Sequence, residues 1–246
     1  MYLIIAYYIT QAKNILNMLQ LTKIKSTGND DSIGITILNT ADFNDMKNKL
    51  SNEHNDTGLE KCDADFLIDY IIKTHHAFAK KNSVIIYNLT QKVAYRHSHQ
   101  REELKKFNEI AFLFFHGLLN QMLREEQSLF PFIRQIIKDR KYPGKNDDDI
   151  SRTLKERIKL EQNKHEEAFK YLKSFREITK DYEIPPDACN EYKSLFKKMK
   201  ELEHDLILHF HLEADILFRK VIIADKEIKQ KAKLNESIYK PRYNSL

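Results

Sequence analysis

Apolar residues recur at steps of three or four from residue 63 onward, the spacing that places them on one face of an α-helix. The pattern predicts four long helices, over 65–96, 100–139, 150–180 and 185–231. Pro131 falls within the second helix and is expected to kink it. Because short polar segments separate the helices, the sequence predicts an all-α, up-down-up-down four-helix bundle.

The first part of the chain lacks this periodicity. It is rich in Asn, Asp, Ser and Thr and holds three of the 5 glycines, which are turn-forming residues. A short strand over 32–38 and a pair of short helices both fit this segment. The sequence therefore divides into a small irregular N-terminal segment over 1–61, whose structure the pattern leaves open, a bundle over 62–232 and a flexible basic tail over 233–246.

Composition narrows the class of protein further. Only 5 Gly and 5 Pro accompany 31% charged residues, which is too little turn chemistry for a many-stranded β-protein. The net charge is +5, but the 41 basic residues are interleaved with 36 acidic ones, which favours a solvated helix surface over a nucleic-acid-binding patch. Two cysteines, Cys62 and Cys189, cannot form a disulfide framework and indicate a reducing cytoplasm. The apolar opening is too short to span a membrane, so we expect no membrane partner. The interleaved charges likewise lead us to expect no nucleic-acid partner.

Polar side chains interrupt the apolar stripes of three helices at similar depth. His209 and Glu213 lie on the stripe of the fourth helix, Glu125 on that of the second and His165 on that of the third. A buried ionised carboxylate costs several kcal/mol unless it is paired or bound to metal. Each residue alone fits a hydrogen-bonded structural role, but all four together predict a metal site, and imidazole with bridging carboxylate suits iron or manganese.

The first helix offers two adjacent histidines, His75 and His76, which project about 100° apart. His75 shares a stripe with Ile71 and Phe78, whereas His76 shares one with Ile72 and Ala79. Periodicity alone slightly favours His75 as the inward residue.

Three stretches carry a resemblance to a known family: 67–76, ending in His75 and His76, then 124–131 and 209–218. Together they resemble the iron-sulfur cluster repair di-iron proteins, which have a hemerythrin-like domain, over roughly residues 62–222. The resemblance implies a bundle of hemerythrin type that holds two non-haem iron ions, bridged by an oxo group and by carboxylates. The metal ligands it implies are His76, Glu125, His165, His209 and Glu213, with the two glutamates as bridges.

The sequence departs from the family pattern at three places, one of which is Arg219, where the family commonly continues Leu-Phe-Pro. Gln121 occupies the position where the family usually has a histidine, and its amide oxygen is a weaker ligand than imidazole. The N-terminal segment lacks the family's cysteine pair. His97 matches a histidine that recurs in the family, but it lies roughly 31 Å beyond His76 along a continuous helix and is therefore expected at a helix end or a second site.

The resemblance implies a cytoplasmic protein that repairs iron-sulfur clusters damaged by nitrosative or oxidative stress, by donating iron or by handling nitric oxide. Iron-sulfur proteins would be its clients, nitric oxide or dioxygen its small ligands, and a homodimer is one candidate assembly. A metal-binding repair protein fits better than a turnover enzyme. The alternatives are a hemerythrin-like protein that binds or senses dioxygen or iron, and a metal-depleted helical scaffold.

Overall fold

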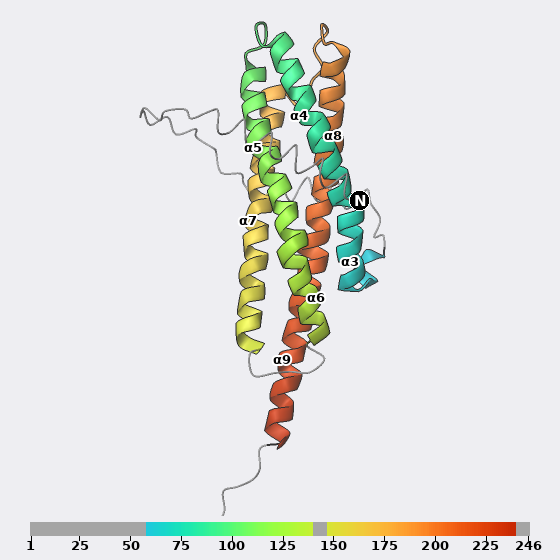
Figure 1. Cartoon of the computed structure of the whole chain (residues 1–246), viewed down its shortest axis with the longest axis vertical. Helices are drawn as coiled ribbons and strands as arrows, with labels where there is room; N and C mark the ends of the chain where they lie inside the picture. Colours follow the sequence, from blue (N-terminus) through green and yellow to red (C-terminus); the bar gives the residue numbers. More distant parts are fainter. Residues whose placement is uncertain (1–57, 140–146, 240–246) are drawn as a thin grey trace, which may run out of the picture. The chain divides into compact units, whose positions relative to one another are not determined.

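The computed structural model describes residues 58–139 and 147–239, and helices joined by short turns make up both ranges (Figure 1). No strand occurs within these two ranges. The alternatives for the N-terminal segment, including a strand over 32–38, lie outside the described residues, as does the end of the tail from residue 240.

Four helical runs make up the described chain, as the periodicity predicts, and a 3-10 turn, η1 (Leu59–Lys61), precedes them. The runs are α3 (Ala64–Tyr70), η2 (Ile71–His76) and α4 (Ala77–His97); α5 (Glu103–Arg124), η3 (Glu125–Leu129) and α6 (Phe130–Asp139); α7 (Asp147–Thr179); and α8 (Asn190–His211), η4 (Leu212–Phe218) and α9 (Arg219–Tyr239). The segments η2, η3 and η4 are π-helical.

The ends of these runs follow from local chemistry. The side chain of Asp63 caps the first run by accepting a hydrogen bond from the backbone N–H of Phe66 at 2.7 Å. Pro131 is the second residue of α6, next to the end of η3, where the N–H of Phe130 donates to the carbonyl of Glu125, five residues back. The last run continues to Tyr239, past the predicted start of the tail at residue 233, because Ala, Lys, Leu and Glu in this stretch favour helix.

The helices pack side by side: α4 lies against both α5 and α8, and α5 lies against α7 (Figure 1). Two apolar clusters fill the interior. One contains Phe107, Phe114, Phe175 and Phe196, and the other contains Ile68, Ile133, Leu154 and Leu217. Each helical run contributes to both clusters, so a layer with a different composition separates them along every run.

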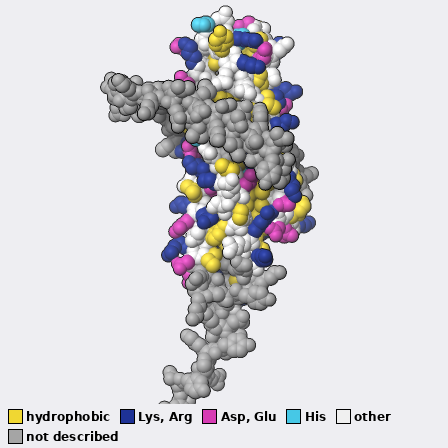
Figure 2. Space-filling view, in the orientation of Figure 1, with side chains coloured by type: hydrophobic (Ala, Val, Ile, Leu, Met, Phe, Trp, Pro, Cys, Tyr) yellow, Lys and Arg dark blue, Asp and Glu magenta, His cyan; other side chains and the backbone are white. Residues whose placement is uncertain are grey.

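The surface in Figure 2 mixes basic and acidic side chains over the described helices, in agreement with the predicted solvated surface. Among the described helices, none combines the length and apolar character that crossing a membrane requires.

The turn between α7 and α8 is fixed by a buried polar network. Three consecutive residues, Lys180, Asp181 and Tyr182, have positive φ angles of 50, 59 and 59°, a conformation that costs energy for residues other than glycine. The buried hydroxyl of Tyr182 donates to Glu203 Oε2 at 3.0 Å, while Arg176 Nε donates to Glu203 Oε1 at 2.5 Å. These bonds hold the strained turn against the bundle.

Tyr182→Phe is expected to lower the free energy of unfolding by about 1.5–3 kcal/mol, because the buried carboxylate of Glu203 loses a hydrogen bond. Urea unfolding followed by circular dichroism measures the change. Tyr95→Phe is the matched control, since Tyr95 is 86% exposed, and it should change stability by less than about 0.5 kcal/mol. Equal losses in the two variants would contradict the assigned role.

Candidate metal centre

Each of the three π-helical segments of the described chain contributes one side chain to the layer between the two apolar clusters. His76 is the last residue of η2, Glu125 the first of η3, and Glu213 the second of η4. A turn closed by i→i+5 hydrogen bonds holds an extra residue, so it changes the direction of the side chains that follow, and such turns are frequent at functional sites. The side chains of His76, Glu125 and Glu213 therefore leave the helices at local breaks in the α-helical hydrogen bonding.

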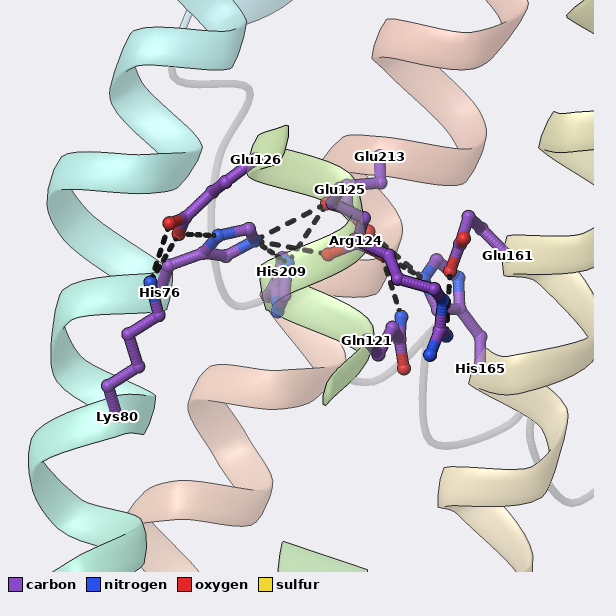
Figure 3. Close-up of polar contacts among 10 residues, drawn as sticks. All are labelled: His76, Lys80, Gln121, Arg124, Glu125, Glu126, Glu161, His165, His209 and Glu213. Atoms are coloured by element: carbon purple, nitrogen blue, oxygen red, sulfur yellow. Dashed lines mark hydrogen bonds and ion pairs between the residues drawn. The ribbon is translucent and has the colours of Figure 1, made fainter. Parts of the chain in front are cut away.

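Four fully buried side chains, those of His76, Glu125, His209 and Glu213, bring one nitrogen or oxygen atom each to within 4.8 Å of all the others (Figure 3). His76 Nε2 lies 3.0 Å from His209 Nε2 and 3.4 Å from Glu125 Oε2. His209 Nε2 lies 3.1 Å from Glu213 Oε1. We call this side of the group position A.

His165 approaches the same two glutamates from α7. Its Nε2 lies 3.0 Å from Glu213 Oε2 and 3.9 Å from Glu125 Oε1. Each glutamate therefore turns one oxygen toward position A and the other toward His165, which defines position B. Carboxylates that face two adjacent positions in this way suit a pair of cations.

The donor atoms of this group fit metal ions. Glu125 Oε2, both carboxylate oxygens of Glu213 and His165 Nε2 are buried and have no well-aligned hydrogen-bond partner among the described residues. Buried charges are costly unless they are paired or coordinate a metal. Imidazole nitrogen and carboxylate oxygen together suit iron and manganese. The arrangement can therefore bind metal at a position from which water is largely excluded.

The electrostatic balance of the group depends on its histidines. Burial lowers the pKa of His76, but the carboxylates of Glu126, Glu213 and Glu125 outweigh burial and raise it to about 9. For His165, burial is likewise outweighed by Glu125 and Glu213, and the pKa rises to about 9. Burial raises the pKa of Glu213, but the neighbouring histidines lower it well below its usual value. Protons on the histidines therefore compete with metal ions for the same carboxylates.

Two residues that sequence reasoning missed orient His76. Glu126 Oε1 accepts a hydrogen bond from His76 Nδ1 at 2.7 Å, and Lys80 Nζ donates to both oxygens of Glu126 at 2.6 and 2.7 Å. This contact turns Nε2 of His76 toward position A, as outer partners of metal-binding histidines commonly do. The sequence offered one signal, since Glu126 directly follows the glutamate predicted as a ligand.

The structure places His76 rather than His75 in the group. His75 is also buried, but its Nδ1 contacts Asp205 Oδ1 at 2.9 Å and its ring stacks on that of His209, with centroids 5.8 Å apart. Periodicity favoured His75 because it assumes 3.6 residues per turn throughout. The π-helical segment η2 ends at His76 and breaks that assumption.

The remaining candidates lie at two different places. Gln121 is buried beside the group, and its amide Nε2 donates to Glu125 Oε1 at 2.9 Å, so its amide oxygen points away from the glutamates (Figure 3). His97 lies at the end of α4, where its Nε2 is 3.2 Å from Cys189 Sγ and its ring packs on Tyr192. His97 is thus absent from the group, in line with its expected helix-end position.

Fold and site together define a class: an all-helical bundle with a buried imidazole–carboxylate group that can hold metal. No family model matches the chain. The iron-sulfur cluster repair protein DnrN of Neisseria gonorrhoeae is 30% identical over 158 residues, which cover 63% of this chain and 89% of that protein. The chain belongs to the iron-sulfur cluster repair protein family.

Two further relatives carry the same family description. The iron-sulfur cluster repair protein ScdA of Staphylococcus epidermidis is 26% identical over 185 residues, which cover 73% of this chain and 79% of that protein. The iron-sulfur cluster repair protein YtfE of Escherichia coli O157:H7 is 25% identical over 159 residues, which cover 65% of this chain and 66% of that protein. The similarity thus extends over about two thirds of the chain.

The metal-free protein is expected to lose stability as pH rises from about 6.5 to about 9. The pKa values of His76 and His165 are raised to about 9 in the folded state, so their contribution is complete below the unfolded value of 6.5 and disappears as they deprotonate. Urea midpoints measured across this range test the prediction.

His165→Gln should reduce this loss, whereas His116→Gln, at an exposed position, should leave it unchanged. Protein loaded with metal should show no such loss, because the cation already holds the histidines deprotonated. A flat profile for metal-free wild-type protein would contradict the assigned ionisation of the group.

Proposed function

We propose that the chain takes part in the repair of damaged iron-sulfur clusters and that it does so through a di-iron centre. The ligands of this centre are His76, Glu125, His165, His209 and Glu213. Membership of a family whose members are named iron-sulfur cluster repair proteins supports the repair role. The observation that carries the di-iron centre is the pair of fully buried glutamates, each of which turns one oxygen to position A and one to position B.

The proposed architecture is a hemerythrin-type bundle in up-down-up-down order. The order in which the runs pass through the apolar clusters supports it. The first and third runs begin in the cluster around Ile68 and Leu154 and end in the cluster around Phe114 and Phe175, while the second and fourth runs pass through them in the reverse order. Successive helices therefore run in opposite directions, and each of them places its polar residues in the same layer.

Different residues of the proposed centre would hold iron at position A and at position B. Two iron ions bound here supply both redox chemistry and iron for transfer to an iron-sulfur client. Glu126 and Lys80 fix the orientation of His76 at position A. Position B has a single imidazole, that of His165, because Gln121 stands where a second is expected.

A cavity of about 210 Å³ lies between α5 and α7, beside the proposed centre. Gln121 and Arg124 line it from α5, and Lys164 and Glu167 line it from α7. Nitric oxide and dioxygen are small enough to use such a cavity. Gln121 lines this cavity and donates a hydrogen bond to Glu125, so it is the residue that separates the cavity from the glutamates.

One observation favours the alternative of a metal-depleted scaffold. With pKa values of about 9, His76 and His165 are protonated at neutral pH in the metal-free protein and balance the charges of Glu125 and Glu213. Protons can therefore stabilise the layer in place of metal. Measurement of metal content separates the two functions.

Glu125→Leu is expected to abolish binding of at least one iron ion while helicity stays unchanged, because an apolar side chain is tolerated at this fully buried position. Elemental analysis of protein purified without oxygen measures the iron, and circular dichroism measures the helicity. Recovery of an iron-sulfur enzyme whose cluster was destroyed by nitric oxide should fail with this variant.

Glu109→Leu is the matched control, since Glu109 is exposed on the same helix, α5. It should bind as much iron as the wild type and restore the client enzyme equally well. Unchanged iron stoichiometry in Glu125→Leu would reject the bridging role, and repair without bound iron would reject the di-iron mechanism.

A further inference from the structure

A third buried glutamate faces the centre from α7. Glu161 lies one helical turn before His165, so both side chains leave the same face of the helix. It is only 4% exposed. Figure 3 shows its carboxylate beside the imidazole of His165 and the guanidinium of Arg124.

The immediate surroundings of Glu161 do not compensate its charge. Its Oε2 atom is buried without a well-aligned hydrogen-bond partner among the described residues. The cation nearest to it in an ion pair is Arg124, whose Nη2 lies 3.7 Å away on a side chain that is 42% exposed. A single long contact with a partly solvated guanidinium contributes little compared with the cost of burying a carboxylate.

Two other carboxylates make this position still less favourable. Glu125 and Glu213 are close enough to repel the charge of Glu161, while Arg124 and His165 attract it. Three carboxylates around one buried layer repel one another. A cation between them would remove this repulsion.

Position B also has a smaller set of donors than position A. Two imidazoles, from His76 and His209, meet the bridging glutamates at position A, whereas His165 alone meets them at position B. Gln121 does not supply the missing donor in its observed orientation, since its amide nitrogen donates to Glu125. A free carboxylate and an incomplete position therefore occur on the same side of the centre.

We propose that Glu161 is a metal ligand at position B and compensates for the imidazole that Gln121 lacks. The assignment rests on the di-iron centre proposed above. Position B then offers one imidazole and three carboxylates, which is a harder and more negatively charged donor set than that of position A. The two positions are inequivalent, and position B prefers hard cations, such as ferric iron or Mn²⁺, over softer ones.

Glu161→Leu tests the assignment through metal binding rather than repair activity. Anaerobic titration with Fe²⁺ and elemental analysis after desalting should give two ions in wild-type protein and one in the variant. The helical circular dichroism should be unchanged, because leucine suits a buried position and removes an uncompensated charge. Glu156→Leu, exposed on the same helix, is the matched control and should retain two ions.

A double variant makes the test specific to position B. Adding Gln121→His to Glu161→Leu should restore the second ion, because imidazole then replaces the lost carboxylate at the same position. Glu161→Gln keeps the side-chain volume and covers the case in which the leucine variant misfolds. The dissociation constant of the Glu161→Gln variant for the second ion should rise by at least about 10-fold. Loss of a residue that only contacts a metal ligand already has an effect of this size, so loss of a ligand should have at least the same effect.

Three outcomes overturn the proposal. If wild-type protein binds no iron, both the di-iron centre and the role of Glu161 are wrong. If wild-type protein and Glu161→Leu both bind two ions with equal affinity, Glu161 is not a ligand, while the di-iron centre stands. If the folded Glu161→Leu variant loses both ions, the effect of Glu161 is not confined to position B.

Discussion

Glu125 and Glu213 place two negative charges at the centre of a helical bundle, where neither side chain is exposed to solvent. Such a pair needs positive charge close by, from protons on histidine or from metal ions. The two carboxylates are surrounded by the imidazoles of His76, His165 and His209. An imidazole can either carry a proton or bind a metal ion. Two apolar clusters enclose this layer, and a π-helical segment occurs at His76 and at each of the two glutamates.

Much of the fold could be predicted from the sequence, because the helical period of apolar residues is strong over all four runs. The same period placed Glu125, His165, His209 and Glu213 inward. It failed at His75 and His76, because the π-helical segment η2 departs from the period of 3.6 residues per turn that the pattern assumes. The resemblance to repair proteins pointed to His76, and the structure places that residue in the group.

The partners of the metal-binding side chains were harder to predict, because their roles depend on distances between helices. Glu126 and Lys80 come from the second and first runs and meet only in the folded bundle. Glu161 lies one turn before His165 on the third helix, but the helical period alone gives no sign that its carboxylate has no strong partner. Gln121, a departure from the family pattern, lies on the same side of the centre as Glu161. In the proposed centre the two residues act together, because the carboxylate of Glu161 replaces the imidazole that is missing at position 121.

X-ray absorption at the iron edge, on wild-type protein loaded with iron without oxygen and matched by elemental analysis, tests the di-iron centre most directly. The account predicts two irons per chain, an iron–iron scattering vector, and light-atom neighbours from imidazole and carboxylate. One iron per chain with light-atom neighbours only, or no bound iron, would contradict it and would leave the buried layer neutralised by protons.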